Sequence, residues 1–166
     1  TIMDLSTGGD IPAIRRAILE KCSVALGTVP IYQASIAKLE KSEAMVNLTV
    51  EEIFAAIVDH ARDGVDFITV HCGITLKTLA RLKTESRITD VVSRGGSFHI
   101  AWMLHNEQEN PLYQYYDRLL DIAKQFDVTL SLGDGLRPGC LEDASDRAQY
   151  EELLTIGELV DRARTA

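Results

Sequence analysis

The sequence lacks most of what would place a protein in an oxidising compartment, in a membrane or on nucleic acid. It has few cysteines, odd in number and far apart, so a reducing, cytoplasmic environment is expected rather than a disulfide framework. No apolar run is long enough to span a bilayer, and the first residues do not resemble a signal peptide. The net charge is −8 without any basic cluster, which disfavours nucleic acid and anionic membranes as partners. The cysteines are Cys22, Cys72 and Cys140.

Motifs that would define a particular chemistry are also missing. No Cys-x-x-Cys pair and no two histidines four apart occur, so this chain by itself offers no ready metal site. No Gly-x-Gly-x-x-Gly motif follows the first predicted strand, which disfavours dinucleotide binding. No lysine stands at a predicted strand end, which disfavours a Schiff-base aldolase. An initiator methionine is absent as well, and we expect the chain to be a segment of a longer protein.

What is present is the composition of a globular domain. Hydrophobic residues make up 46% of the chain and charged residues 25%, over a length of 166 residues that is sufficient for one core. The hydrophobic pattern predicts strands and helices in alternation. Strands are expected at 1–6, 26–32, 66–72, 88–93 and 128–134. Helices are expected at 11–22, 50–63, 75–85, 97–105, 111–126 and from near 145 to 163, with a short helix and loop within 33–47.

Alternation at this spacing implies an α/β fold with a parallel sheet. Units of about 25–40 residues fit a (β/α)8 barrel, which needs about 250 residues when it is intact. We therefore expect residues 1–166 to form one partial barrel domain with about five βα units. The alternative is a complete, five-stranded doubly wound sheet, which a chain of 166 residues could build.

The stretch VTLSLGDGLRPG, residues 128–139, carries the strongest local signal. A buried strand runs into a turn rich in glycine and proline, which holds Asp134 and Arg137 three positions apart. In a parallel α/β fold this end of a strand is where ligands bind. A carboxylate beside a guanidinium suits a substrate that has a hydrogen-bond donor and an anionic group such as phosphate. A purely structural Asp–Arg pair is the alternative.

Polar residues also follow the other predicted strands. Because parallel strands point the same way, these residues are expected to form one polar mouth over an apolar core, as in the active site of a barrel. This argument concerns the layout and does not identify a reaction. The residues are Asp4, Ser6 and Thr7 after the first strand, Tyr32 and Gln33 after the second, His71 and Cys72 after the third, and Ser93 and Arg94 after the fourth.

Several of these residues suggest individual roles. His71 suits a hydrogen-bond partner or a general acid–base for a heterocycle, or it is a histidine satisfied in the core. Arg94 and two glycines open a helix, where free N–H groups and the guanidinium favour an anion. Tyr32 either stacks on a ring or packs. Residues expected only to pack or to lie on the surface are Met3, His60, Cys72, His99 and His105.

Seven stretches together resemble the phosphomethylpyrimidine synthase family, in the order in which that family has them. They are MDLSTGGDI, GTVPIYQA, GVDFITVHCGI, VSRGGS, ENPLY, SLGDGLRPG and DASDRAQYEEL, and they span almost the whole chain. The resemblance implies a (β/α)8 barrel and a lyase of the non-standard radical S-adenosylmethionine class. Such a lyase rearranges 5-aminoimidazole ribonucleotide into hydroxymethylpyrimidine phosphate during thiamin biosynthesis.

The resemblance also implies which residues bind the substrate. It gives Met3, otherwise expected to pack, a place in the site, and it supports phosphate or ribose binding at the two arginine turns. No residue is implied as the one that acts in the radical chemistry. The implied substrate-binding residues are Met3, Tyr32, His71, Ser93, Arg94, Gly95, Asp134, Gly135, Leu136 and Arg137.

The family further requires S-adenosylmethionine, a [4Fe–4S] cluster and a divalent metal such as zinc. Their ligands are expected outside this chain, because the family's Glu-x-Pro-Gly-His segment and its cysteine motif do not occur in these 166 residues. The chain alone is therefore expected to be inactive. A cytoplasmic homodimer is implied for the full-length protein. Anaerobic 5-hydroxybenzimidazole synthase, which shares the substrate and these motifs, is the alternative.

Overall fold

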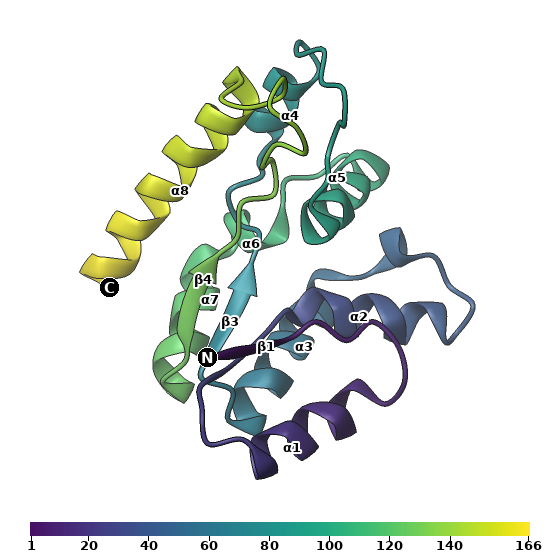
Figure 1. The fold of residues 1–166 in the computed structure, drawn as a ribbon, viewed down its shortest axis with the longest axis vertical. Coiled ribbons are helices and arrows are strands. Elements are labelled where there is room, and N and C mark those ends of the chain that lie inside the picture. Colours follow the sequence, from purple (N-terminus) through teal and green to yellow (C-terminus); the bar gives the residue numbers. More distant parts are fainter. The chain divides into compact units, whose positions relative to one another are not determined.

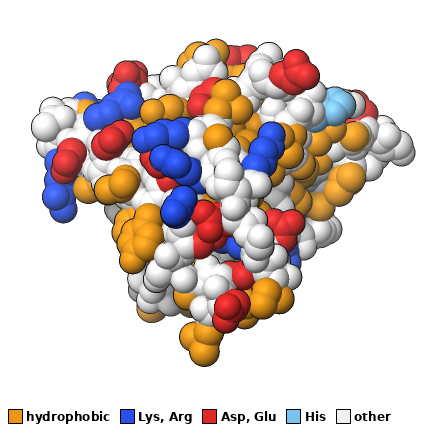
Figure 2. Space-filling model, turned by 90° about the horizontal axis from the view of Figure 1, so that it is seen from above, with side chains coloured by type: hydrophobic (Ala, Val, Ile, Leu, Met, Phe, Trp, Pro, Cys, Tyr) orange, Lys and Arg blue, Asp and Glu red, His pale blue; other side chains and the backbone are white.

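The structure, a computed structural model, describes all residues from Thr1 to Ala166 and is of mixed α/β type. The chain divides into two compact units, residues 1–70 with 117–131 and residues 71–116 with 132–166 (Figure 1). No helix combines the length and the apolar character needed to cross a bilayer. On the face drawn in Figure 2, acidic side chains lie beside basic ones.

The first unit is built on a four-stranded sheet whose strands follow one another in chain order. The strands β1 and β2 are parallel, as are β2 and β3, and Gly27 lies opposite both Met3 and Phe67. The N–H of Thr129 donates to the carbonyl oxygen of Asp66 at 3.0 Å, next to where β4 neighbours β3. The order is the one that successive βα units produce. The strands are β1 (Ile2–Asp4), β2 (Leu26–Thr28), β3 (Phe67–Val70) and β4 (Thr129–Leu132).

Local sequence signals set the ends of the helices in this unit. Asp10 caps α1, and Thr49 forms a capping box with Glu52 at the start of α3. Gly64 ends α3 in the left-handed conformation, with φ at 90°. The core is formed mainly by Leu26, Phe54, Ile57 and Ile68. The helices are α1 (Ile11–Lys21), α2 (Pro30–Leu39), α3 (Val50–Asp63) and α7 (Tyr116–Phe126), with the 3-10 turn η1 at Met45–Asn47.

A buried polar network connects α1, α2 and α3. Arg15 is only 1% exposed. It donates to Asp63 Oδ2 at 2.6 Å and to Gln33 Oε1 at 2.7 Å. His60 lies 3.0 Å from the same Gln33 oxygen and 2.8 Å from Thr28 Oγ1. Because that Gln33 oxygen only accepts, His60 donates through Nε2 and accepts through Nδ1. The network holds the side chain of Gln33, which follows Tyr32 in the first turn of α2.

The second unit is helical, with α4 packed on α8. Each helix begins at a side chain that accepts a backbone N–H, and these caps are Thr75, Ser93, Asn110 and Asp146. The buried residues include Ile74, Met103, Leu136 and Leu159. The helices are α4 (Leu76–Leu82), α5 (Arg94–Asn106), α6 (Pro111–Gln114) and α8 (Arg147–Thr165).

The strand predicted at 88–93 does not form. The N–H groups of Ile88 and Thr89 donate to the carboxylate of Asp143 at 2.7 and 2.9 Å instead of to a neighbouring strand. Since Asp143 lies 54 residues further along the chain from Thr89, this pairing had no local signal. The structure thus has four strands where five were predicted.

Two other predicted boundaries were wrong in part. The strand predicted at 26–32 ends at Thr28, because Pro30 has the fixed φ of a first helical turn and begins α2. The helix predicted at 111–126 is divided at Tyr115 into α6 and α7. On α8, the apolar Leu153 is 59% exposed, whereas the acidic Glu152 is buried.

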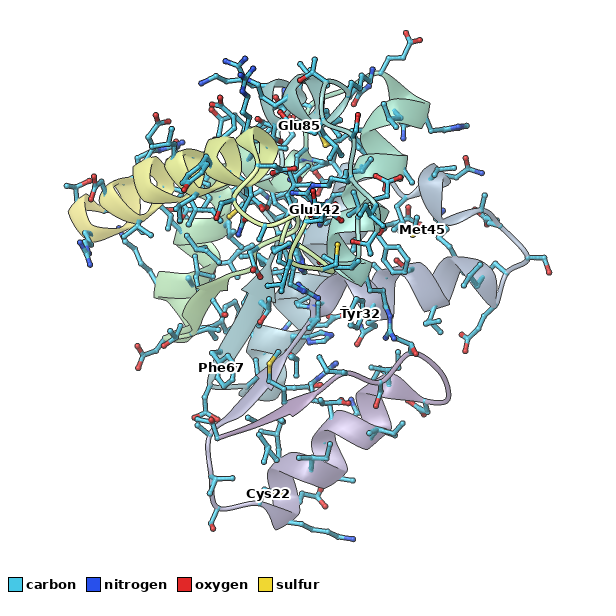
Figure 3. All side chains as sticks on the ribbon, turned by 45° about the horizontal axis from the view of Figure 1, so that its top comes forward. Cys22, Tyr32, Met45, Phe67, Glu85 and Glu142 are labelled. Atoms are coloured by element: carbon cyan, nitrogen blue, oxygen red, sulfur yellow. The ribbon has the colours of Figure 1, made fainter.

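We predict that Gly27→Ala destabilises the protein, whereas Gly157→Ala does not. A Cβ atom at Gly27 would lie 2.0 Å from Cε2 of Phe67, the labelled residue on β3 in Figure 3. The ring must move, at a cost of about 1–3 kcal/mol. A Cβ atom at Gly157, within α8, would meet nothing within 4 Å, and alanine there should add about 0.5–1 kcal/mol of stability.

Urea unfolding followed by circular dichroism would measure both variants. Equal stability of Gly27→Ala and the parent protein would contradict the packing of Phe67 over Gly27. Destabilisation by Gly157→Ala would contradict the open space that surrounds Gly157 on α8.

Candidate functional site

The segment that carries His71 is fixed by a buried asparagine. His71 directly follows β3. Asn110, which is completely buried, donates from Nδ2 to the carbonyl oxygen of His71 at 2.8 Å and to that of Ile74 at 2.9 Å. Its own Oδ1 accepts the N–H of Leu112. One side chain thus ties the chain after β3 to the start of α6, and the position of His71 follows from that bond.

The first turn of α5 approaches His71 because it has no side chain at the point of contact. A Cβ atom at Gly95 would lie 2.2 Å from Cε1 and 2.4 Å from Nδ1 of the His71 ring. At Gly96 it would lie 2.5 Å from the carbonyl oxygen of Gly135. The two glycines therefore let the His71 segment, the α5 terminus and the turn at Gly135 meet. The segment after β3, the start of α5 and the turn after β4 thus lie together in the second unit, and their shared role in a substrate site stays a prediction.

Ser93 and Arg94 differ in their exposure. Ser93 is buried, and its hydroxyl oxygen accepts the N–H of Gly96 at 3.2 Å as the cap of α5. Arg94, the first residue of α5, lies at the surface. Ser93 therefore shapes the helix start, and Arg94 presents a positive charge at the end of the helix where the helix dipole is also positive.

The turn at residues 134–137 exposes its charged groups and buries its centre. Arg137 Nη1 donates to the carbonyl oxygen of Asp134 at 3.2 Å and lies 3.6 Å from Asp134 Oδ1, with both side chains exposed. Gly135 and Leu136 are buried, and their N–H groups donate to the carboxylate of Glu152, each at 2.7 Å. The Asp–Arg pair predicted from the sequence is thus present and faces outward.

Burial keeps two imidazoles of the site neutral. Burial is the main cause that lowers the pKa of His71 to about 4; the positive charge of Arg137 contributes in the same direction and Asp134 opposes it. Burial, with His71 as a lesser cause, lowers the pKa of His99 to about 3. The ring centroids are 6.2 Å apart, and both His71 Nδ1 and His99 Nε2 lack a hydrogen-bond partner. A neutral His71 can donate through one ring nitrogen and accept through the other.

Met3 and Tyr32, the remaining predicted site residues, belong to the first unit. Met3 lies on β1 and is 44% exposed, an unusual position for a core residue. Tyr32 is half-buried in the first turn of α2, where Figure 3 labels it. Cys72 is fully buried, and burial raises the pKa of its thiol to about 12, which agrees with the predicted packing role.

Sequence reasoning missed three residues that build the site. Asn110 had a signal, because asparagine before proline is a common helix cap. His99 was expected on a surface or in packing contacts, and nothing in its helical position indicated its contact with His71. Glu152 lies on a helix and was not singled out at all. No three or more His, Cys, Asp or Glu side chains are arranged to hold a metal ion, so the residues of this chain do not fit a metal or iron–sulfur site.

Comparisons with known proteins identify the class. The family model described as the radical SAM ThiC family matches residues 1–166, and the chain belongs to that family. It is 62% identical over 165 residues to phosphomethylpyrimidine synthase of Moorella thermoacetica, which covers 99% of this chain and 38% of that protein. The corresponding enzyme of Caldanaerobacter subterraneus is 63% identical over the same shares. The enzyme of Dehalococcoides mccartyi is 58% identical over the whole chain.

The chain thus spans 38% of the length of these curated relatives. The glycine turns, the histidine and the Asp–Arg pair described above all lie within the matched residues. The family suggested by the sequence motifs is confirmed.

We predict that acid destabilises the protein through its buried imidazoles. His71 and His99 have folded pKa values of about 4 and about 3, below the ordinary 6.5. The contribution of the two neutral imidazoles to the free energy of unfolding is fully present above pH 6.5. It is lost as the pH falls toward these pKa values, because the unfolded chain binds more protons there. The loss by pH 4 is on the order of 3 kcal/mol for each imidazole.

Urea unfolding at pH 7.5, 5.5 and 4.5 would measure this loss, with His99→Phe as the comparison. The variant should lose less stability than the parent protein between pH 7.5 and 4.5, whatever its stability at neutral pH. Parallel pH profiles would contradict the assignment of a neutral, buried His99.

Proposed function

We propose that this chain supplies much of the substrate site of a phosphomethylpyrimidine synthase. The proposed reaction is the radical rearrangement of 5-aminoimidazole ribonucleotide to hydroxymethylpyrimidine phosphate in thiamin biosynthesis. The observation that carries the proposal is the meeting of His71, the glycine start of α5 and the Asp134–Arg137 turn in one unit. The names of the relatives, all phosphomethylpyrimidine synthases, support the pyrimidine product over a hydroxybenzimidazole.

The fold in this proposal is part of a (β/α)8 barrel. The sheet supports it because its strands run in chain order, β1-β2-β3-β4, without reversal. A doubly wound sheet reverses its strand order at a switch point, which is where such a fold binds its ligand. Polar site residues also follow β3 and β4 in the chain, as they do at the active end of a barrel.

Each proposed contact follows from the chemistry of its residue. The phosphate would be held by Arg94 and Arg137, because guanidinium groups bind phosphate through paired N–H donors. The start of α5 adds the positive end of a helix of 13 residues. A neutral His71 would hydrogen-bond the aminoimidazole or ribose, and Asp134 would accept from a hydroxyl or amino group. Met3, Tyr32, Ser93, Gly95, Gly135 and Leu136 complete the proposed substrate site.

The cofactors are proposed to be held by other parts of the full-length protein. S-adenosylmethionine and an iron–sulfur cluster supply the radical when they are bound, and a divalent metal such as zinc accompanies them. Within this chain the residues bind and orient the substrate. We further propose that the enzyme is a cytoplasmic homodimer and that it acts as a lyase.

We predict that Arg137→Ala in the full-length protein weakens binding of 5-aminoimidazole ribonucleotide by about 10- to 100-fold, because a charged hydrogen bond to phosphate is worth about 1.5–3 kcal/mol. Isothermal titration calorimetry without S-adenosylmethionine would measure the affinity. Arg164→Ala, which removes an exposed charge near the end of α8, is the matched control. Equal affinity of Arg137→Ala and the parent protein would remove Arg137 from the site.

We also predict that residues 1–166 alone form no pyrimidine product. Reconstitution with iron, sulfide, S-adenosylmethionine and reductant, followed by chromatography, would measure the product. Turnover by the isolated segment would contradict the proposed division of cofactor ligands.

A further inference from the structure

We propose that Glu152 is a positioning residue that holds the Asp134–Arg137 turn in the conformation that receives the substrate. The inference rests on the proposed function, because it assumes that this turn binds the ribonucleotide. Glu152 lies in the second turn of α8 and is 1% exposed. Its two carboxylate oxygens accept the N–H groups of two consecutive residues, Gly135 and Leu136, each at 2.7 Å.

Both the N–H and the carbonyl group of Leu136 in the turn are hydrogen-bonded to charged side chains. While the N–H of Leu136 donates to Glu152, its carbonyl oxygen accepts from Arg87 Nη2 at 2.8 Å. Arg87 is in turn bound by Asp146, the cap of α8, with Nη2 2.9 Å from Oδ1. The beginning of α8 therefore fixes both polar groups of Leu136, one directly and one through Arg87. Hydrogen bonds to charged groups are about twice as strong as neutral ones.

The backbone approaches the Glu152 side chain closely at two glycines. A Cβ atom at Gly135 would lie 2.1 Å from Ile74 Cδ1 and 3.1 Å from Glu152 Oε1. At Gly73 it would lie 2.9 Å from Glu152 Cγ. Because the two glycines let the Glu152 side chain lie close to the backbone and both of its oxygens bind the turn, a displacement of that side chain is expected to move the turn. Asp134 and Arg137, on either side of the fixed pair, move with it.

A direct chemical role for Glu152 does not fit this geometry. Both oxygens are engaged by the backbone, and the side chain is buried, so it does not reach a substrate. Burial raises the pKa of Glu152 to about 7, with Asp134 adding to the effect, whereas the two N–H groups and Arg87 lower it. Cys72 is the other titratable neighbour whose charge is coupled to Glu152. Protonation of this carboxylate would leave one of its two oxygens a poorer acceptor for the backbone N–H groups of the turn.

Glu152→Gln in the full-length protein tests the inference, with Glu151→Gln as the matched control. The two changes remove the same charge from adjacent positions of α8. Glu151, however, pairs with Lys77 and Arg81 of α4 and makes no hydrogen bond to the turn. The glutamine amide at 152 would point N–H groups at a backbone N–H, so the turn loses one of its two bonds.

We expect Glu152→Gln to weaken binding of 5-aminoimidazole ribonucleotide by about tenfold or more by calorimetry. Hydrogen exchange followed by mass spectrometry should show faster exchange in the peptide that contains Gly135 and Leu136, measured at a temperature where the variant is fully folded. Glu151→Gln should change neither quantity. Glu152→Asp, which keeps the charge on a shorter side chain, should restore part of the affinity.

The outcomes separate this inference from the proposed function. If the parent protein does not bind the ribonucleotide, the proposed function fails. If the parent binds and Glu152→Gln binds equally well with unchanged exchange at Gly135 and Leu136, the positioning role is overturned while the function stands. If Glu152→Gln does not fold, Glu152→Asp decides by the same two measurements.

Discussion

The second unit depends on the close approach of backbone to backbone and of backbone to an imidazole. Gly96 brings α5 against the carbonyl oxygen of Gly135, and Gly95 brings it against the ring of His71. Any Cβ atom at these positions would lie at 2.2 to 2.5 Å from its neighbour, a separation that packed atoms do not tolerate. The two glycines therefore matter because they lack a Cβ atom, which allows the neighbouring segments to approach closely. Three chain segments meet there because α5 has no side chain at Gly95, where it meets the His71 ring, or at Gly96, where it meets the backbone of Gly135.

Carboxylates hold the loops that glycine allows to approach. Asp66, Asp143 and Glu152 each accept backbone N–H groups from a segment distant in the sequence, at 2.7 to 2.9 Å. Some of the acidic side chains behind the net charge of −8 therefore act as hydrogen-bond acceptors inside the protein. They accept backbone N–H groups that are not bonded to a neighbouring strand. These hydrogen bonds explain how long irregular segments such as 83–93 hold a defined conformation without pairing in a β-sheet. A buried N–H left without an acceptor would cost about 1–3 kcal/mol.

The elements that the sequence predicted correctly are those with local causes. Asp10, Thr49 and Gly64 end helices through contacts within a few residues, and the apolar pattern of 128–132 marks β4 regardless of its surroundings. The failures have distant causes. The segment 88–93 looked like a strand, but its N–H groups are taken by Asp143. Arg15, whose burial no sequence pattern indicated, is buried because Asp63 and Gln33 accept its hydrogen bonds. Pro30 was the exception, since its preference for a first helical turn was readable.

For this protein the sequence by itself determined the family, the sequence of most elements and the residues at the candidate site, because glycine turns and charged strand ends are local patterns. Only the tertiary structure decided which residues support that site. Asn110, His99 and Glu152 reach His71 or the turn at Gly135 across 17 to 39 residues of chain. Such contacts depend on how α5, α6 and α8 pack, and helix packing is set by the summed shape of many side chains rather than by any motif.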